Sequence, residues 1–250
     1  MTQNIEIERR SAVQIIRMNR PEKKNALTRA MYAAMADALT GGDADPAVRV
    51  HVFLGVPGAF SAGNDLADFL AIATGGEGGS EVCDFLLALA GSQKPIVSGV
   101  DGVAVGIGTT INLHCDLTFA TPRTVFRTPF VDLGLVPEAG SSLLAPRLLG
   151  RQGAFALLGL GEGFSAERAR DAGLIYDVVE EGRLEDATLA AAEDIAAKPP
   201  EALRIARDLM LGSREELKER IRIESQYFRE RLASDEARAA LMAFMNRRKA

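Results

Sequence analysis

The sequence predicts an α/β protein in which strand-rich residues 1–180 precede a helical region over residues 200–246. Short apolar segments separated by small-residue turns dominate the first part, and this pattern is typical of buried strands. Helical patterns follow one another after about Ser165. At 250 residues, 47% of them hydrophobic, the chain can bury a large core in one or two domains. Because no long linker is visible, we expect a core over residues 1–199 and a helical region over 200–250.

The first elements follow from periodicity and turn residues. Alternating apolar residues at 5–7 and 13–18 predict two antiparallel strands, and Pro21 lies in the turn that ends the second. Thr28 is suited to cap a helix that runs to about Leu39 and is ended by the glycine pair at 41–42.

The remaining elements are shorter and alternate between strands and helices. Ile175–Val179 is the one late strand expected. Ser213 and Glu216 match a capping box, in which the side chain of each residue accepts a hydrogen bond from the backbone N–H of the other. The other expected strands are 48–54, 96–98, 103–105, 117–119 and 125–126, and the other expected helices are 81–90 and 107–114.

Composition excludes several classes of protein. Twenty-nine basic against 34 acidic residues give a net charge of −5, without the basic stripe of a nucleic-acid-binding protein. Stretches without Asp, Glu, Lys or Arg, such as Gly102–Cys115, are too short to span a bilayer, and we expect no secretory signal. Two cysteines and two histidines exclude a disulfide framework or a cysteine-rich metal site. We therefore expect a cytoplasmic protein with no nucleic-acid or membrane partner.

Two glycine-containing turns are candidates for chemistry. Residues 60–66 follow a strand, and residues 101–108 open a helix. Glycine permits backbone conformations that direct amide N–H groups outward, so two such turns can aim two amides at one developing oxyanion. The alternative is that both are ordinary tight turns. Motifs that bind dinucleotides or nucleoside triphosphates are absent.

These turns belong to a longer series of motifs that resembles the crotonase (enoyl-CoA hydratase/isomerase) superfamily over essentially the whole chain. The resemblance implies a crotonase-like spiral of ββα units whose C-terminal helices assemble a homotrimer or a dimer of trimers. It also implies an acyl-CoA thioester substrate and no separate cofactor, because coenzyme A is part of the substrate. The motifs are Asn19-Arg20-Pro21, Asn25-Ala26-Leu27, Phe60–Leu66, Asp101–Gly108, Cys115-Asp116-Leu117, Phe126–Pro129, Leu135–Ser142 and Gly173-Leu174.

The resemblance assigns roles to particular residues. The amides of Asn64 and Ile107 would form the oxyanion hole. Lys24, and Arg247 from a neighbouring subunit, would approach the CoA phosphates. Residues of the adenine pocket would be Ala62, Asp65 and Leu66, and further substrate or CoA contacts would be Ala26, Gly63, Gly106, Phe130, Leu133 and Phe244.

Departures from the family pattern indicate the reaction. Thr110 and Phe130 stand where typical hydratases carry their two glutamates, whereas Glu138 stands where hydratases usually have glycine. This arrangement resembles the peroxisomal-type delta-3,delta-2-enoyl-CoA isomerases, whose single base moves a proton from C2 to C4 of a 3-enoyl thioester. We expect Phe130 and Leu133 to raise the pKa of Glu138 by desolvation and still leave it ionised near neutrality.

Other readings of the sequence remain open. The protein could be an enoyl-CoA hydratase, an enzyme of another crotonase activity, or an acyl-CoA-binding protein without turnover. Glu138 could also be an ordinary carboxylate favoured at a helix N-terminus. For the assembly, we expect the subunit interface to be supplied by apolar stripes on the terminal helices, namely Leu217, Ile221, Phe228, Leu232, Leu241, Phe244 and Met245.

Overall fold

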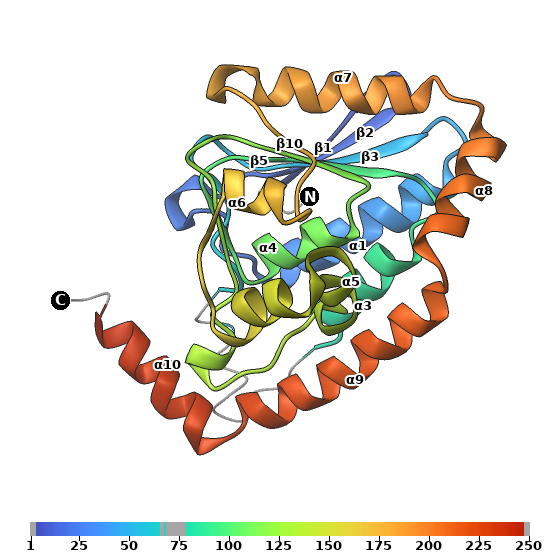
Figure 1. Ribbon diagram of the computed structural model, residues 1–250. Coiled ribbons are helices and arrows are strands. Elements are labelled where there is room, and N and C mark those ends of the chain that lie inside the picture. Colours follow the sequence, from blue (N-terminus) through green and yellow to red (C-terminus); the bar gives the residue numbers. More distant parts are fainter. Residues whose placement is uncertain (1–3, 66–67, 69–78, 248–250) are drawn as a thin grey trace.

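The computed structural model describes residues 4–65, 68 and 79–247, which form two sheets covered by helices (Figure 1). The strands are β1 (Ile5–Arg10), β2 (Val13–Met18), β3 (Val50–Leu54), β4 (Ala59–Ser61), β5 (Ile96–Val100), β6 (Val103–Val105), β7 (Leu117–Ala120), β8 (Val125–Arg127), β9 (Phe164–Ser165) and β10 (Asp177–Val178). The α-helices are α1 (Arg29–Ala44), α3 (Glu81–Gly91), α4 (Ile107–Thr110), α5 (Ser141–Ala154), α6 (Ala166–Asp171), α7 (Leu184–Ala196), α8 (Pro200–Leu211), α9 (Arg214–Leu232) and α10 (Asp235–Arg247). Short 3₁₀ segments are η1 (Pro21–Lys23), η2 (Ile111–His114), η3 (Val131–Leu133) and η5 (Glu181–Arg183), and η4 (Phe155–Gly159) is a π-helical turn.

From β3 to β8, consecutive strands of the chain alternate between two sheets. Within the described residues, the larger sheet has the order β1-β2-β3-β5-β7-β10 and the smaller sheet the order β4-β6-β8-β9. Strands β3, β5 and β7 are parallel neighbours, and the strands that follow each of them, β4, β6 and β8, are parallel neighbours in the second sheet. The chain therefore winds as a spiral of ββ units separated by helices, which confirms the predicted fold class.

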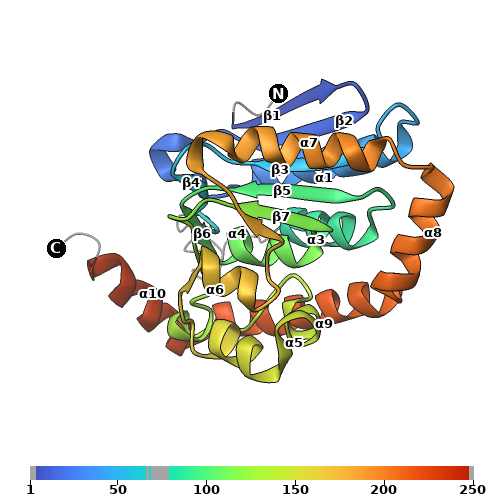
Figure 2. The ribbon, with the colours of Figure 1, turned by 45° about the horizontal axis from the view of Figure 1, so that its top comes forward.

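The larger sheet is buried on both faces, as parallel strands usually are. Alternate residues Val50, Val52 and Leu54 of β3 pack with α7, whereas Phe53 faces the core on the other side with α1 and α3. Figure 2 shows α7 crossing one face of the sheet while α1 and α3 lie beneath it. On that second face the ring of Phe85 lies 6.3 Å from that of Phe53, centroid to centroid.

The first helix starts as predicted and ends later. Thr28 caps α1 by accepting a hydrogen bond from the N–H of Met31. The glycine pair at 41–42 does not stop the helix, so that prediction is wrong. Gly42 lies inside α1. Glycine is needed at this position because a Cβ there would come within 2.2 Å of Gln14 Oε1. The helix ends at Ala44 because Pro46 favours an extended conformation at Asp45, which is observed.

Two other local predictions are corrected in part. The late strand β10 has only two residues, and β9, which pairs with β8, was not predicted. Ser213 caps α9 by accepting from the N–H of Glu216. The carboxylate of Glu216 accepts instead from Arg147 on α5, so only half of the capping box is observed.

The C-terminal helices α8, α9 and α10 run along one edge of the core (Figure 1). The predicted interface stripe on them is buried within the chain itself: Ile221, Leu232 and Leu241 are fully buried, and Leu217 and Phe228 pack partly buried against the same core. Ile221, Leu232 and Leu241 therefore cannot supply a subunit interface, and the prediction is wrong for these three residues. The apolar residues exposed on these helices are Ile205, Leu209, Met210, Leu211, Ile223, Tyr227 and Met242.

The stripe was misassigned because the sequence shows that a helix face is apolar but not what covers it. Phe244 and Met245 belong to the same predicted stripe, and their side chains lie outside the described residues. None of the helices in the described ranges combines the length and the apolar character that crossing a bilayer requires.

Candidate active site

The two predicted glycine turns contact each other. Gly63 has φ +90° and Gly106 has φ +57° with ψ −120°, conformations that favour glycine. A Cβ on Gly106 would lie 4.0 Å from Gly63 Cα, and a Cβ on Gly63 would lie 3.0 Å from the carbonyl oxygen of Val105. The parallel pairing of β4 with β6 holds the turns together, since each turn follows directly after its strand.

The amides expected to form the oxyanion hole are available as donors. The N–H groups of Asn64 and Ile107 donate to no acceptor within the described part of the chain. Ile107 is the first residue of α4, where a helix leaves its N–H without an internal acceptor. The neighbours of Asn64 are fixed, because Asp65 N–H donates to Leu27 O at 2.9 Å.

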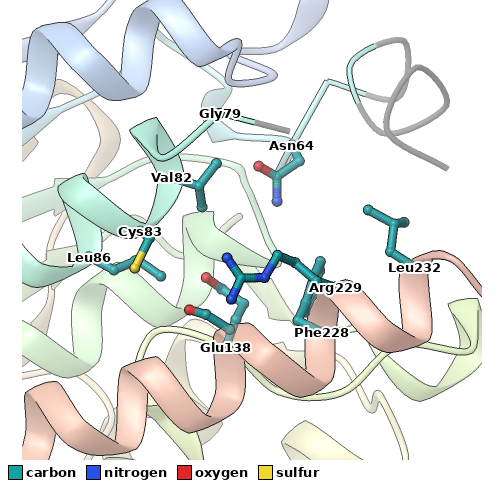
Figure 3. Close-up of a pocket in the computed structure, with 10 residues that line it drawn as sticks. Asn64, Gly79, Val82, Cys83, Leu86, Glu138, Phe228, Arg229 and Leu232 are labelled. Atoms are coloured by element: carbon teal, nitrogen blue, oxygen red, sulfur yellow. The ribbon is translucent and has the colours of Figure 1, made fainter. Parts of the chain in front are cut away.

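Glu138 lies beside these turns with its carboxyl group in a pocket between α3 and α9 (Figure 3). Its Oε1 accepts a hydrogen bond of 2.7 Å from Thr110 Oγ1, and only 5% of the residue is exposed. Burial raises the pKa of Glu138 to about 8, an effect to which the negative charge of Glu224 adds and which the Thr110 hydrogen bond opposes. The carboxyl group is thus a proton carrier poised close to neutral pH.

The pKa of Glu138 agrees with the expected direction of the shift but not with the expected ionisation state. Desolvation does raise the pKa of Glu138, but a value of about 8 leaves most of the carboxyl groups protonated at pH 7, so the prediction of an ionised group is wrong. Phe130 is buried in the core and Leu133 packs partly buried against it, and neither lines the pocket around Glu138. Glu138 is instead buried beside Thr110 of α4 and near Glu224 of α9, and a linear sequence does not show this proximity.

The pocket encloses about 120 Å³ and has walls from distant parts of the chain (Figure 3). Residues of α3 and α9 form most of its lining, and none of them was predicted. The signal that could have identified α9 is a helix with an apolar stripe that contains a glutamate, since a charge in such a stripe has to be paired. The lining residues are Asn64, Gly79, Val82, Cys83, Leu86, Glu138, Ser225, Phe228, Arg229 and Leu232.

Tyr32 is a further polar group near the site that sequence analysis missed. Tyr32 lies on α1, and its side chain is fully buried. Its hydroxyl donates a hydrogen bond of 2.6 Å to Asn64 Oδ1. Burial, and to a smaller extent the charge of Glu138, raise the pKa of Tyr32 well above its usual value, so the hydroxyl remains a donor. This hydrogen bond fixes the Asn64 side chain and, with it, the turn that carries the Asn64 amide.

The structure brings most of the predicted CoA contacts together. Residues 24–27 pair with residues 62–65, since Ala62 N–H donates to Lys24 O at 2.8 Å and Leu27 N–H donates to Gly63 O at 2.8 Å. Ala26 is held in the same segment, because its carbonyl oxygen accepts from Arg20. Asp65 forms an ion pair of 2.6 Å with Arg20.

Some of the predicted contacts cannot be located in this way. Leu66 and the side chains of Phe244 and Arg247 lie outside the described residues. The assignments of Lys24, Ala62, Asp65 and the other CoA contacts remain predictions.

The surroundings of His114 and Cys115, near the site, indicate structural roles rather than catalytic ones. The ring Nε2 of His114 lies 2.7 Å from Ala139 O, and burial lowers the pKa of His114 to about 4. The ring is therefore neutral and Nε2 carries the proton that it donates. Burial raises the pKa of Cys115 to about 12, which excludes a thiolate nucleophile near neutral pH.

Comparison with known proteins adds independent evidence. The sequence profile described as Enoyl-CoA hydratase/isomerase matches residues 8–250. Enoyl-CoA delta isomerase 2 of Rattus norvegicus is 34% identical over 93% of this chain, which spans 61% of the length of the rat protein. A probable enoyl-CoA hydratase of Rhizobium meliloti is 32% identical, with 98% of this chain and 95% of that protein covered. The 1,2-epoxyphenylacetyl-CoA isomerase of Escherichia coli is also 32% identical, with 94% and 93% covered.

Solved structures are similar over nearly their whole length. Pseudomonas aeruginosa OdaA superposes with a TM-score of 0.93 at 42% identity, covering 98% of this chain and 99% of that one. An enoyl-CoA hydratase/isomerase from Pseudoalteromonas atlantica superposes with a TM-score of 0.92 at 36% identity, covering 98% of each chain. With the profile match and the spiral fold, these likenesses show that the chain belongs to the enoyl-CoA hydratase/isomerase, or crotonase, family.

Proposed function

We propose that the protein shifts the double bond of a 3-enoyl-CoA thioester to give the 2-trans-enoyl-CoA. The observation that carries the proposal is a single carboxyl group, Glu138, in the lining of the pocket, next to the turn that carries the Asn64 amide. A 1,3-proton shift needs one group that can first accept and then donate a proton, and a carboxyl group with a pKa of about 8 suits both steps.

In the proposed reaction, ionised Glu138 takes a proton from C2 of the substrate. The electron pair left at C2 delocalises into the thioester, and the negative charge develops on the carbonyl oxygen. The N–H groups of Asn64 and Ile107 donate to that oxygen; a donor of this kind contributes roughly 3–4 kcal/mol of transition-state stabilisation. The protonated carboxyl then gives its proton to C4, the double bond forms between C2 and C3, and Glu138 is ionised again.

The raised pKa of Glu138 has opposite effects on the two halves of this cycle. At pH 7 roughly one Glu138 in ten is ionised, which limits proton removal, while the protonated form that appears in the intermediate is stable in the buried site. Thr110 holds Oε1, so the carboxyl group keeps a fixed orientation during both transfers.

The proposal predicts that hydration is slow. Addition of water needs a base for the water and an acid for the α-carbon, and the described lining of the pocket offers Glu138 alone as a carboxyl group. Thr110 stands at a position where, by family resemblance, hydratases carry a glutamate, and its hydroxyl is a poor acid. A missing acid or base typically costs about 10²–10⁴-fold in rate.

The test is a direct comparison of substrates with the purified protein. Formation of the conjugated thioester from cis- and trans-3-enoyl-CoA is followed by ultraviolet absorbance, beside hydration of crotonyl-CoA. Isomerisation should be much faster than hydration. Faster hydration would assign a hydratase instead, and binding of acyl-CoA without turnover of any of these thioesters would assign a binding protein.

We also propose that the protein is a homotrimer or a dimer of trimers, with an apolar surface that differs from the one predicted. Leu209 is 80% exposed and Met210 is 77% exposed at the end of α8, and Tyr227 is exposed on α9. Large apolar side chains exposed in this way favour burial against another subunit. Light scattering that gave a monomer at micromolar concentration would contradict this assembly.

A further inference from the structure

The turn that carries Glu138 has a backbone conformation that needs support. Ala139 and Gly140 are consecutive residues with φ +62° and +67°, immediately before α5. For a residue with a side chain, such as Ala139, the left-handed region costs roughly 1–2 kcal/mol. Contacts from elsewhere in the fold must therefore hold this turn if Glu138 is to face the pocket.

Glu224 of α9 supplies the closest of these contacts. Its Oε2 accepts a hydrogen bond of 2.6 Å from Gly140 N–H, and its Oε1 accepts one of 2.9 Å from Ser142 N–H. Only 5% of the residue is exposed, so this is a buried carboxyl group with both oxygens used as acceptors. Glu224 and Gly140 are 84 residues apart, and the clamp is a tertiary feature.

The same face of α9 packs on the turn around these hydrogen bonds. A Cβ on Gly140 would come within 2.4 Å of Leu217 Cδ1 and 3.3 Å of Ile221 Cγ1, which are two turns and one turn before Glu224 on the helix. The residues that follow, Ser225 and Phe228, line the pocket. One helix therefore touches both the support of the catalytic carboxyl group and the wall of the pocket.

Three other groups from different elements surround the turn. His114 from η2 donates to Ala139 O as a neutral ring, and Tyr32 from α1 holds Asn64. Arg220, one turn earlier on α9, donates to Ser142 Oγ at 3.1 Å and favours the ionised form of Glu224. Burial raises the pKa of Glu224, and its hydrogen bonds to Gly140 and Ser142 oppose that shift.

We propose that Glu224 is a positioning residue for the reaction, which clamps the Ala139–Ser142 turn so that Glu138 faces the pocket. The inference rests on the proposed role of Glu138 as the proton carrier. It differs from a purely structural cap of α5, because a cap would change the stability of the fold while leaving the rate and pH profile of the folded enzyme unchanged.

The experiment compares Glu224→Gln with wild type in steady-state isomerisation of a 3-enoyl-CoA between pH 6 and 9. Gln keeps the size of the side chain but removes the charge and can accept only one of the two N–H bonds. A misplacement of about 1 Å can cost 10²-fold, so we expect kcat to fall by about 10–10²-fold while KM changes by less than about threefold. The midpoint of the pH profile should move to lower pH, because Glu138 loses a neighbouring negative charge.

Two further variants separate positioning from folding. Glu216→Gln is the matched control, since Glu216 also joins α9 to α5 through Arg147 but is exposed and far from the turn; it should leave kcat and the pH midpoint unchanged. Glu224→Asp keeps the charge on a shorter side chain, so it should lower kcat while the pH midpoint stays near wild type. If Glu224→Gln fails to fold, Glu224→Asp carries the test.

The inference is overturned if folded Glu224→Gln or Glu224→Asp keeps the wild-type kcat. Failure of the proposed function gives a different result, because wild type itself would then not turn over the 3-enoyl-CoA. In that case NMR titration of carboxyl-labelled glutamate decides the point without activity: the Glu138 midpoint should fall in Glu224→Gln and stay constant in Glu216→Gln, and an unchanged midpoint contradicts the clamp.

Discussion

Two of the walls of the pocket are built in different ways. The wall from the spiral core consists of turns and a buried carboxyl group, where Asn64 and Glu138 are held by backbone pairing and by Thr110. The wall from α9 consists of side chains on a regular helix, where Phe228 and Leu232 are apolar and Arg229 is exposed. Under the proposed function, the core wall would carry the chemistry and the α9 wall would shape the space for the acyl chain. Substitutions in the first should change kcat, and those in the second should change KM and substrate preference.

The strongest test of the core wall is Glu138→Gln, which keeps the shape and removes the proton carrier. Isomerase kcat should fall by about 10²–10⁴-fold, while binding of acyl-CoA should change little because the predicted CoA contacts lie elsewhere. Steady-state kinetics and calorimetric titration measure the two effects. A variant that retains most of the isomerase rate would falsify the assignment of the base.

The same variant should not destabilise the fold. The pKa of Glu138 is raised in the folded state, so the folded protein keeps a proton that the unfolded chain loses above about pH 4.5. Stability therefore falls as pH rises from about 4.5 toward 8, and Gln lacks this penalty. The melting temperature of Glu138→Gln, relative to wild type, should increase between pH 5 and pH 8; a relative decrease would contradict the raised pKa.

The next largest effect is expected at the second turn, in Gly106→Ala. A Cβ at this position meets no close neighbour, but φ +57° with ψ −120° is unfavourable for alanine, so the turn should shift and misdirect the Ile107 amide. Loss of an oxyanion donor costs about 10²–10³-fold, and a misdirected donor should cost up to about 10²-fold in kcat.

Gly212→Ala is the matched control for this variant. Gly212 has φ +74° and ψ −148°, with open space around its Cβ position, and it lies between α8 and α9 away from the pocket. Both variants carry similar backbone strain, so both should lose similar stability. Equal losses of kcat in the two would show that the effect is global rather than specific to the oxyanion turn.

How much the sequence predicts differs between the walls for a physical reason. Gly63, Gly106 and Glu138 were predicted because the core wall depends on local backbone chemistry and on motifs that resemble the family. The wall from α9 was missed, because packing between residues far apart in sequence decides what an apolar helix face covers. The rise in the pKa of Glu138 was predicted, but its extent was missed for the same reason, since the negative charge of Glu224, 86 positions away in the printed sequence, adds to the effect of burial.

The α9 wall is tested by Phe228→Ala. Truncation enlarges the pocket without touching the carboxyl group or the turns, so kcat for a short 3-enoyl-CoA should stay within about threefold of wild type. Its KM should rise by about tenfold, since a lost apolar contact is worth roughly 1–3 kcal/mol, and longer acyl chains should be favoured relative to short ones. A fall in kcat as large as that of Glu138→Gln, with KM unchanged, would break the division between the walls.

The smallest effect should come from Thr110, whose hydrogen bond favours the ionised form of Glu138. In wild type, kcat/KM for isomerisation should rise with pH to a half-maximal value near pH 8, since the base has to be ionised. Tyr32 titrates well above this range and His114 well below it, so neither should shape the profile between pH 6 and 9.

Thr110→Val removes the donor, which raises the pKa of Glu138 further and leaves less ionised base at pH 7. Activity at pH 7 should fall by about three- to tenfold and recover as the pH rises, because the hydrogen bond to a charged group is worth about 1.5–3 kcal/mol, part of which the protonated form retains. Thr110→Ser keeps the hydroxyl and should keep the wild-type midpoint. A Thr110→Val profile that is lowered equally at every pH would mean that Thr110 orients the carboxyl group without affecting its ionisation.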